Sequence, residues 1–155
     1  MLIFFMEKQS DCPEKFIPHV FEKEFSFGSG NIEKVWINLN KRETFCKGQL
    51  FPYRVEFETG QDTGNFKTGE LNIHHGPLLS VHGEIGEITN SYRDLRYFYG
   101  SYVLSFRLVR PVRLEFMREG SRLKVRLTSF VRPWFKFFWE KGNAFFWNFF
   151  DRTVL

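Results

Sequence analysis

The chain has 155 residues, which is the size of one domain and long enough to bury a substantial core. It carries 22 Lys and Arg against 18 Asp and Glu, so its formal net charge is +4. This mild excess is compatible with an anionic ligand or an acidic membrane surface. It falls short of the dense basic patches of dedicated nucleic-acid binders, so we expect no nucleic-acid partner. No run reaches the roughly 18 apolar residues that a membrane span requires.

Residues 1–18 are predicted to form an N-terminal arm before a single domain at residues 19–155. The first six residues are apolar, but they lack the basic start and the small-residue cleavage site of a secretory signal. Cys12 and Cys46 have no metal-type spacing, so we expect free thiols and a cytoplasmic location. One disulfide between these two cysteines stays open at this stage.

Hydrophobic patterning predicts a strand and then two short helices. Residues 19–27 alternate between apolar and polar positions, which is typical of a half-buried strand. Residues 31–39 follow helical spacing, and Asn31 is predicted to cap that helix. Its apolar positions are Ile32, Val35, Trp36 and Leu39. A second short helix is expected at about residues 43–47.

The middle of the chain predicts an antiparallel sheet. Strands are expected at residues 53–59, 66–74, 78–88, 93–99, 112–118 and 122–130, separated by turn residues. Residues 101–109 could form either a strand or a loop. In the last two strands one face is apolar and the other is charged, as an antiparallel sheet with one solvated side allows. The apolar face carries Val112, Leu114, Phe116, Leu123, Val125 and Leu127.

The tail is exceptionally aromatic, because ten of the seventeen residues from Trp134 to Phe150 are Phe or Trp. Pro133 suits a first helical turn, so we predict one long helix. Eight aromatic residues fall in an arc about 160° wide with Gly142 near its middle. They are Trp134, Phe135, Phe138, Trp139, Phe145, Phe146, Phe149 and Phe150. The opposite side carries Lys136, Glu140, Asn143 and Ala144, with Phe137 and Trp147 as apolar exceptions. We expect the arc to be buried against the sheet, either as plain core or as the lid of a cavity.

Several diffuse patterns resemble the START-like superfamily. They are Val35-Trp36, His82-Gly83-Glu84-Ile85, Arg93-Asp94-Leu95-Arg96-Tyr97 and Leu114-Glu115-Phe116. The resemblance implies an α+β helix-grip fold, in which a curved antiparallel sheet of about six or seven strands wraps around the C-terminal helix. Members of this superfamily bind lipids, sterols or polyketides in an apolar cavity between the sheet and that helix, and some act as aromatases or cyclases. They share no catalytic set that carries over, so no catalytic residue is predicted.

We therefore expect the chain to bind a hydrophobic small molecule or lipid between the sheet and the terminal helix. The expected apolar lining is Trp36, Leu114, Phe116, Val125, Phe135, Phe138, Trp139, Gly142 and Phe146. His82, Arg96 and Tyr97 are expected to orient the ligand, and Arg96 to neutralise a carboxylate.

Two other functions stay open. A cyclase or dehydratase would use His82, Glu84 and Arg96 inside the cavity. A membrane-surface or protein-interaction module would use Phe137 and Trp147 of the helix, together with nearby lysines. The sequence leaves monomer and homodimer open.

No metal and no cofactor are expected. If Gly76 and Pro77 are the central residues of a hairpin, His75 pairs with Leu78 and Leu71 pairs with His82. His75 and His82 then lie roughly 13 Å apart along the strands, too far for one ion.

Overall fold

The computed structural model describes residues 11–155 apart from 48–51, 53, 78, 99–101 and 104–107. Within these residues eight strands form one antiparallel sheet, in the order β1-β8-β7-β5-β4-β3-β2, with the short β6 pairing with β4 and β7. The strands are β1 (Ile17–Ser26), β2 (Arg54–Phe57), β3 (Leu71–Gly76), β4 (Leu79–Ile88), β5 (Tyr92–Tyr97), β6 (Tyr102–Val103), β7 (Val109–Glu119) and β8 (Arg122–Val131). The helices are α1 (Asn31–Leu39), α2 (Arg42–Lys47), the 3-10 turn η1 (Pro133–Phe135), α3 (Lys136–Trp147) and α4 (Phe150–Val154). The predicted α+β order is confirmed.

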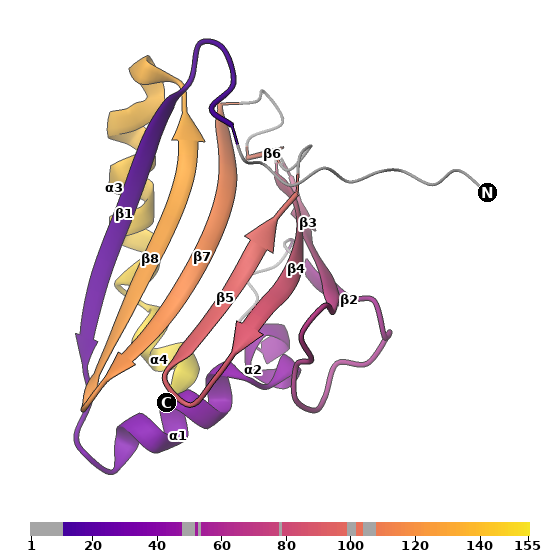
Figure 1. Ribbon diagram of the computed structural model, residues 1–155, viewed down its shortest axis with the longest axis vertical. Helices are drawn as coiled ribbons and strands as arrows, with labels where there is room; N and C mark the ends of the chain where they lie inside the picture. Colours follow the sequence, from indigo (N-terminus) through magenta and orange to yellow (C-terminus); the bar gives the residue numbers. More distant parts are fainter. Residues whose placement is uncertain (1–10, 48–51, 53, 78, 99–101, 104–107) are drawn as a thin grey trace.

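Different helices cover different parts of the sheet. Figure 1 shows α3 running alongside β1 and β8, whereas α1, α2 and α4 gather at one end of the sheet. The first and last long strands, β1 and β8, pair along their full length from Ile17 opposite Val131 to Ser26 opposite Arg122. The N-terminal strand therefore lies under the C-terminal helix, and the cover over β2, β3 and β5 comes from α2.

Two hydrophobic clusters fill the space between the sheet and the helices. The larger one lies beneath α1 and α4, and Phe116 of β7 is almost completely buried in it beside Trp147 and Phe150. Burying one such ring stabilises the fold by about 1.5–3 kcal/mol. The smaller cluster lies beneath α2, where Phe57 and Phe66 pack 5.3 Å apart between ring centroids. A cavity lies within the smaller cluster, and the candidate site is built around it.

Three local predictions need correction. Asn31 is the first residue of α1 and not its cap; Gly30 takes that place, with no side-chain cap. The third strand begins at Leu71 instead of residue 66. Phe66 belongs to the preceding loop, and its backbone N–H donates to the carbonyl of Asn40. The hairpin register is shifted by two residues, so that His75 pairs with Ser80 and Leu71 pairs with Glu84. The shift arises because Gly76, expected as a central residue of the turn, is still part of the strand and pairs with Leu79.

The terminal helix is rotated about its axis relative to the prediction. Asn143 and Trp147 are its buried residues, whereas most of the aromatic arc faces outward. The rotation amounts to roughly one residue step, about 100°. Its cause is the inward face of β1, which carries His19 and Lys23 and therefore attracts polar partners on the helix. Glu140 contacts His19 at 3.3 Å, and Asn148 accepts a hydrogen bond from Lys23.

Candidate ligand-binding site

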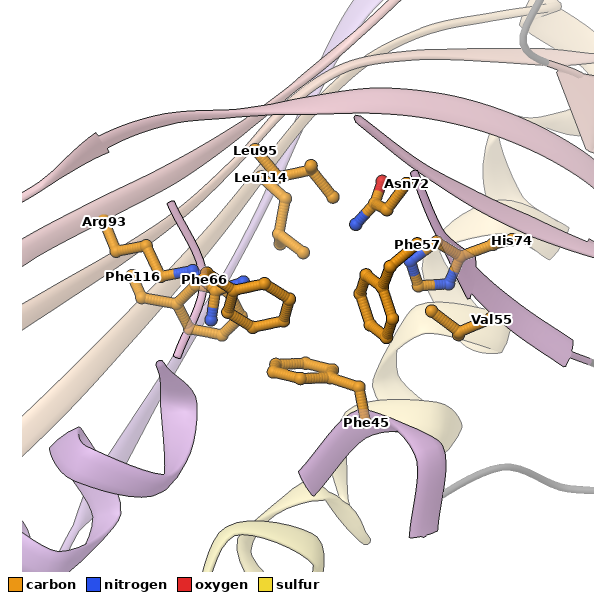
Figure 2. Close-up of a pocket in the computed structure, with 10 residues that line it drawn as sticks. All are labelled: Phe45, Val55, Phe57, Phe66, Asn72, His74, Arg93, Leu95, Leu114 and Phe116. Atoms are coloured by element: carbon orange, nitrogen blue, oxygen red, sulfur yellow. The ribbon is translucent and has the colours of Figure 1, made fainter. Parts of the chain in front are cut away.

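An enclosed cavity of about 30 Å³ lies within the smaller cluster, between α2 and the inner face of the sheet (Figure 2). It has room for one or two water molecules. Ten side chains line it: Phe45 from α2, Val55 and Phe57 from β2, Phe66 from the preceding loop of β3, Asn72 and His74 from β3, Arg93 and Leu95 from β5, and Leu114 and Phe116 from β7. Seven of them are apolar, so the three polar ones are conspicuous.

Arg93 is a positive charge in this apolar interior. Its side chain comes from the centre of the sheet, is only 3% exposed and points towards the cavity in Figure 2. The guanidinium carbon lies 4.4 Å from the ring centroid of Phe66, 5.1 Å from that of Phe45 and 5.6 Å from that of Phe116. These ring faces offset part of the cost of desolvating the charge. Among the described residues, neither Nε nor Nη1 of Arg93 has a hydrogen-bond partner.

The charge state of Arg93 follows from its burial. Desolvation lowers the pKa of Arg93 to about 9, with a partial offset from Tyr97 and Asp94. The guanidinium is therefore still protonated at pH 7. A buried cation whose N–H groups lack acceptors is costly, and an acceptor placed in the cavity would recover that cost.

Two neutral polar groups accompany Arg93 on β3. Burial, assisted by repulsion from Arg93, lowers the pKa of His74 to about 4, so the imidazole is neutral at physiological pH. Asn72 is buried, and its Oδ1 has no hydrogen-bond partner among the described residues. The cavity thus offers one cation and two neutral hydrogen-bonding side chains, all on strands.

A buried ion pair holds α2 over the cavity. Arg42 donates from Nε and Nη2 to the two carboxylate oxygens of Glu70, at 2.6 and 2.7 Å. Arg42 Nη1 also donates to the carbonyl of Thr63 at 2.8 Å, and the N–H of Lys67 donates to Glu70. These bonds fix the first turn of α2 and so place the Phe45 ring against the cavity.

An open hollow adjoins the cavity at β2, the edge strand of the sheet. It has a volume of about 490 Å³ and is lined by Cys46, Arg54, Val55, Glu56, Phe57, Gly60 and Asp62. Val55 and Phe57 line both spaces. Among the described residues, these two side chains therefore lie between the cavity and the hollow.

The structure brings part of the predicted site together. Leu114 and Phe116 line the cavity, and Tyr97 lies in the same cluster with its phenol pKa raised by burial. Trp36 and Val125 are buried in the larger cluster, where Trp36 donates its indole N–H to the carbonyl of Thr89 at 3.3 Å. Their role towards a ligand stays a prediction.

His82 and Arg96 lie on the outer face of the sheet, not in the interior. Strand alternation places Val81, Gly83 and Ile85 inward, so His82 points outward and contacts Ser80 at 3.1 Å. Arg96 donates to Asp94 at 2.9 Å. Glu84 pairs across the strands with Arg96, and it shares this face. The set required for the cyclase alternative therefore does not converge inside the fold.

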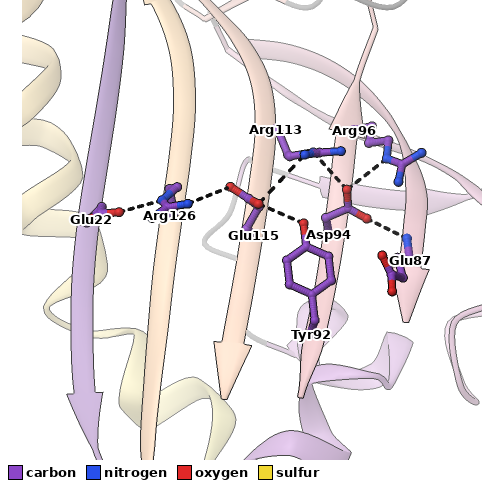
Figure 3. A network of polar contacts seen from close by, with 8 residues as sticks. All are labelled: Glu22, Glu87, Tyr92, Asp94, Arg96, Arg113, Glu115 and Arg126. Carbon is purple, nitrogen blue, oxygen red and sulfur yellow. Dashed lines mark hydrogen bonds and ion pairs between the residues drawn. The ribbon is translucent and has the colours of Figure 1, made fainter. Parts of the chain in front are cut away.

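The outer face around Arg96 is a chain of alternating charges (Figure 3). Asp94 is fully buried near one end of this chain, 2.9 Å from Arg96 and 3.0 Å from Arg113, and it also accepts the N–H of Glu87. The chain continues through Glu115, Arg126 and Glu22 to β1. Each charge in it has a partner, so we interpret this chain as a stabilising network across the sheet.

Five predicted lining residues belong to the C-terminal helical region, and the structure separates them. Trp139 is half-buried against the smaller cluster, and Phe135 is half-buried. Phe138, Gly142 and Phe146 lie on the exposed side of α3. These three cannot line an interior cavity in this conformation, because the helix turns its opposite side to β1.

Sequence reasoning missed the charged lining. Arg93 shares its strand face with Leu95 and Tyr97, and all three are buried. The prediction chose Arg96 together with Tyr97, although adjacent strand residues point to opposite faces. Strict alternation from Tyr97 would have indicated Arg93 instead.

No protein-family model matches the sequence, and no characterised protein matches it with significance. Among solved structures, the chain is similar to norcoclaurine synthase from Thalictrum flavum in complex with dopamine and hydroxybenzaldehyde. The TM-score is 0.51 and the identity 13%, over 78% of this chain and 74% of that chain. It is also similar to the hypothetical protein jhp0584 from Helicobacter pylori, with a TM-score of 0.45 and 12% identity over 76% of this chain and 74% of that one. Only the first similarity supports an argument, and at this identity it concerns the fold alone. The chain shares this overall fold, a curved antiparallel sheet with a C-terminal helix, which is the helix-grip arrangement that was predicted.

Proposed function

We propose that this protein binds a small amphipathic molecule in the interior of the sheet beside α2, with its anionic group on Arg93 and its apolar body among the surrounding rings. The observation that carries the proposal is the buried guanidinium of Arg93, whose Nε and Nη1 lack partners among the described residues and border an apolar cavity. A carboxylate is an anion to which a guanidinium N–H donates a strong, charge-assisted hydrogen bond.

The size of the cavity sets a condition on this function. Ligand pockets usually measure about 300–1,000 Å³, so 30 Å³ admits no organic ligand without rearrangement. The adjoining hollow of about 490 Å³ supplies the missing space once Val55 or Phe57 turns aside. Binding thus selects a conformation in which the two spaces join, and part of the binding free energy is spent on opening it.

The fold gives additional support. The norcoclaurine synthase structure holds dopamine and hydroxybenzaldehyde, so a protein of this architecture accommodates small aromatic compounds. The present chain surrounds its own cavity with four Phe rings, which suit an aromatic or aliphatic ligand body.

Calorimetric titration with matched probes tests the proposal. The probes are octanoate and 2-naphthoate, each compared with the corresponding alcohol. We expect the carboxylates to bind more tightly than the alcohols by at least tenfold, as a charge-assisted contact of about 1.5–3 kcal/mol predicts. Arg93→Met should abolish this preference while keeping the apolar volume. Arg96→Met, on the outer face of the same strand, should preserve it.

A variant with a larger cavity shows whether a failure to bind is caused only by the size of the probe. Phe45→Ala removes one ring from the lining and should strengthen binding of the bulkier naphthoate. Failure of both the wild type and Phe45→Ala to bind any probe would overturn the proposal. Equal carboxylate binding by Arg93→Met would overturn the role of Arg93.

A further inference from the structure

The outward side of α3 is an apolar surface of unusual density. Six large aromatic side chains of η1, α3 and the α3–α4 junction are between 49% and 69% exposed. We call them the aromatic face: Trp134, Phe137, Phe138, Phe145, Phe146 and Phe149. Single exposed rings are common on soluble proteins, but a contiguous set along one helix marks an interaction surface.

Several rings of the aromatic face pack against one another. Phe137 and Phe138 lie 5.8 Å apart between centroids, and Phe145 and Phe149 lie 5.3 Å apart. Gly142 stands exposed between these two pairs, and a Cβ built on it would meet nothing within 4 Å. No side chain therefore stands between the two pairs of rings at Gly142.

Contacts with β1 keep this face outward. Glu140 and Asn148 bind His19 and Lys23 of the strand, and Trp147 is buried on the same side. Turning the rings inward would break both polar contacts and expose Trp147. The aromatic face is consequently available to a partner without refolding of the helix.

Cations are interspersed with the rings. Lys141 and Arg152 are exposed on this region. The Lys141 ammonium lies 5.6 Å from the centroid of Phe137, and the Arg152 guanidinium lies 5.8 Å from that of Phe149. Glu140 lies on the side of α3 that meets β1, where it contacts His19, so it does not lie among these cations. The surface that α3 presents is thus aromatic and positive.

We propose that the aromatic face docks this protein on an anionic lipid bilayer, with α3 lying in the plane of the interface. Aromatic rings settle at the level of the headgroups, and Lys and Arg side chains reach outward to anionic phosphates. The contact is peripheral, since no helix among the described residues is long and apolar enough to cross a membrane. A second copy of the chain fits less well, because a twofold pairing of this face would oppose its own cations.

Sedimentation with vesicles tests the docking. Vesicles of phosphatidylcholine with 30% phosphatidylserine are compared with pure phosphatidylcholine at about 0.15 M salt, where charge steering is partly screened. We expect the wild type to bind the anionic vesicles at least tenfold more tightly. The triple variant Phe138→Ser, Phe145→Ser, Phe149→Ser should lose binding to both by tenfold or more. The double variant Lys141→Gln, Arg152→Gln should lose mainly the preference for phosphatidylserine.

The matched control exchanges exposed apolar residues elsewhere. Val20→Ser, Ile37→Ser removes two side chains that are 52% and 54% exposed on β1 and α1, and it should bind vesicles as the wild type does. Circular dichroism of each variant establishes that the fold is retained. Wild-type protein that stays in the supernatant with anionic vesicles would overturn the proposal. So would analytical ultracentrifugation showing a dimer that the triple variant converts to a monomer, because the face would then join two copies.

Discussion

The imidazole Nε2 of His19 on β1 lies 3.3 Å from the carboxylate Oε1 of Glu140 on α3. This contact joins positions 121 residues apart and determines which side of the terminal helix meets the sheet. Because His19 holds Glu140 against β1, the cavity and the aromatic face lie on different sides of the structure. The cavity around Arg93 faces inward, and the aromatic face points outward.

The contact should be measurable as stability. His19→Ala removes a buried ring and a hydrogen bond, so we expect the free energy of unfolding to fall by about 2 kcal/mol. Glu140→Gln keeps an acceptor oxygen on a half-exposed side chain and should change it by less than about 0.5 kcal/mol. Urea unfolding of both variants gives the comparison. A Glu140→Gln loss as large as that of His19→Ala would show that charge, not the hydrogen bond, fixes the helix.

The same contact explains what sequence patterning could and could not predict. Period-two alternation placed the strands, because each has one apolar and one polar side. The rotation of α3 could not be predicted from its apolar residues, since aromatic rings occupy most of its circumference. The deciding information lay in β1, whose inward His19 and Lys23 require polar partners on the helix. Such a pairing of distant polar residues leaves no periodic signal.

The candidate site was only partly predictable for a related reason. Leu114 and Phe116 followed from alternation, and both line the cavity. Phe45 and Phe66 belong to a short helix and a loop, where no period indicates the inward side. Their approach to Arg93 depends on the bond between Arg42 of α2 and Glu70. This bond joins two segments that are distant in the sequence, so a local pattern does not reveal it.

The Arg42–Glu70 pair should be among the most sensitive positions in the chain. Both side chains are buried and joined by two hydrogen bonds, so Glu70→Ala would leave a buried guanidinium uncompensated. We expect a loss of about 3–5 kcal/mol in the free energy of unfolding. The matched control is Glu24→Ala, which breaks an exposed contact to Arg122 and should cost about 0–1 kcal/mol. Equal losses in denaturant titrations would contradict the assigned difference in burial.

Two glycines should respond to alanine in opposite directions. At Gly86 of β4 a Cβ would lie 2.1 Å from Asp94 Oδ1, and Asp94 is fully buried in the outer charge network. Gly86→Ala must therefore displace a paired carboxylate, and we expect a loss of about 2–4 kcal/mol. Gly142→Ala meets open space in the middle of α3 and should stabilise the protein by up to about 1 kcal/mol. Thermal unfolding separates the two; a destabilised Gly142→Ala would mean that the outer side of α3 is covered.

Acid should destabilise the protein through His74. The pKa of this imidazole is lowered from 6.5 to about 4 by burial and by Arg93, so the folded state resists the proton that the unfolded chain accepts. The associated stability is fully present above pH 6.5 and is lost as the pH falls towards 4, by about 2–3 kcal/mol in all. His74→Gln, which cannot titrate, should flatten this part of the curve of unfolding free energy against pH. An unaltered slope in His74→Gln would show that the imidazole is hydrated and does not belong to the closed cavity.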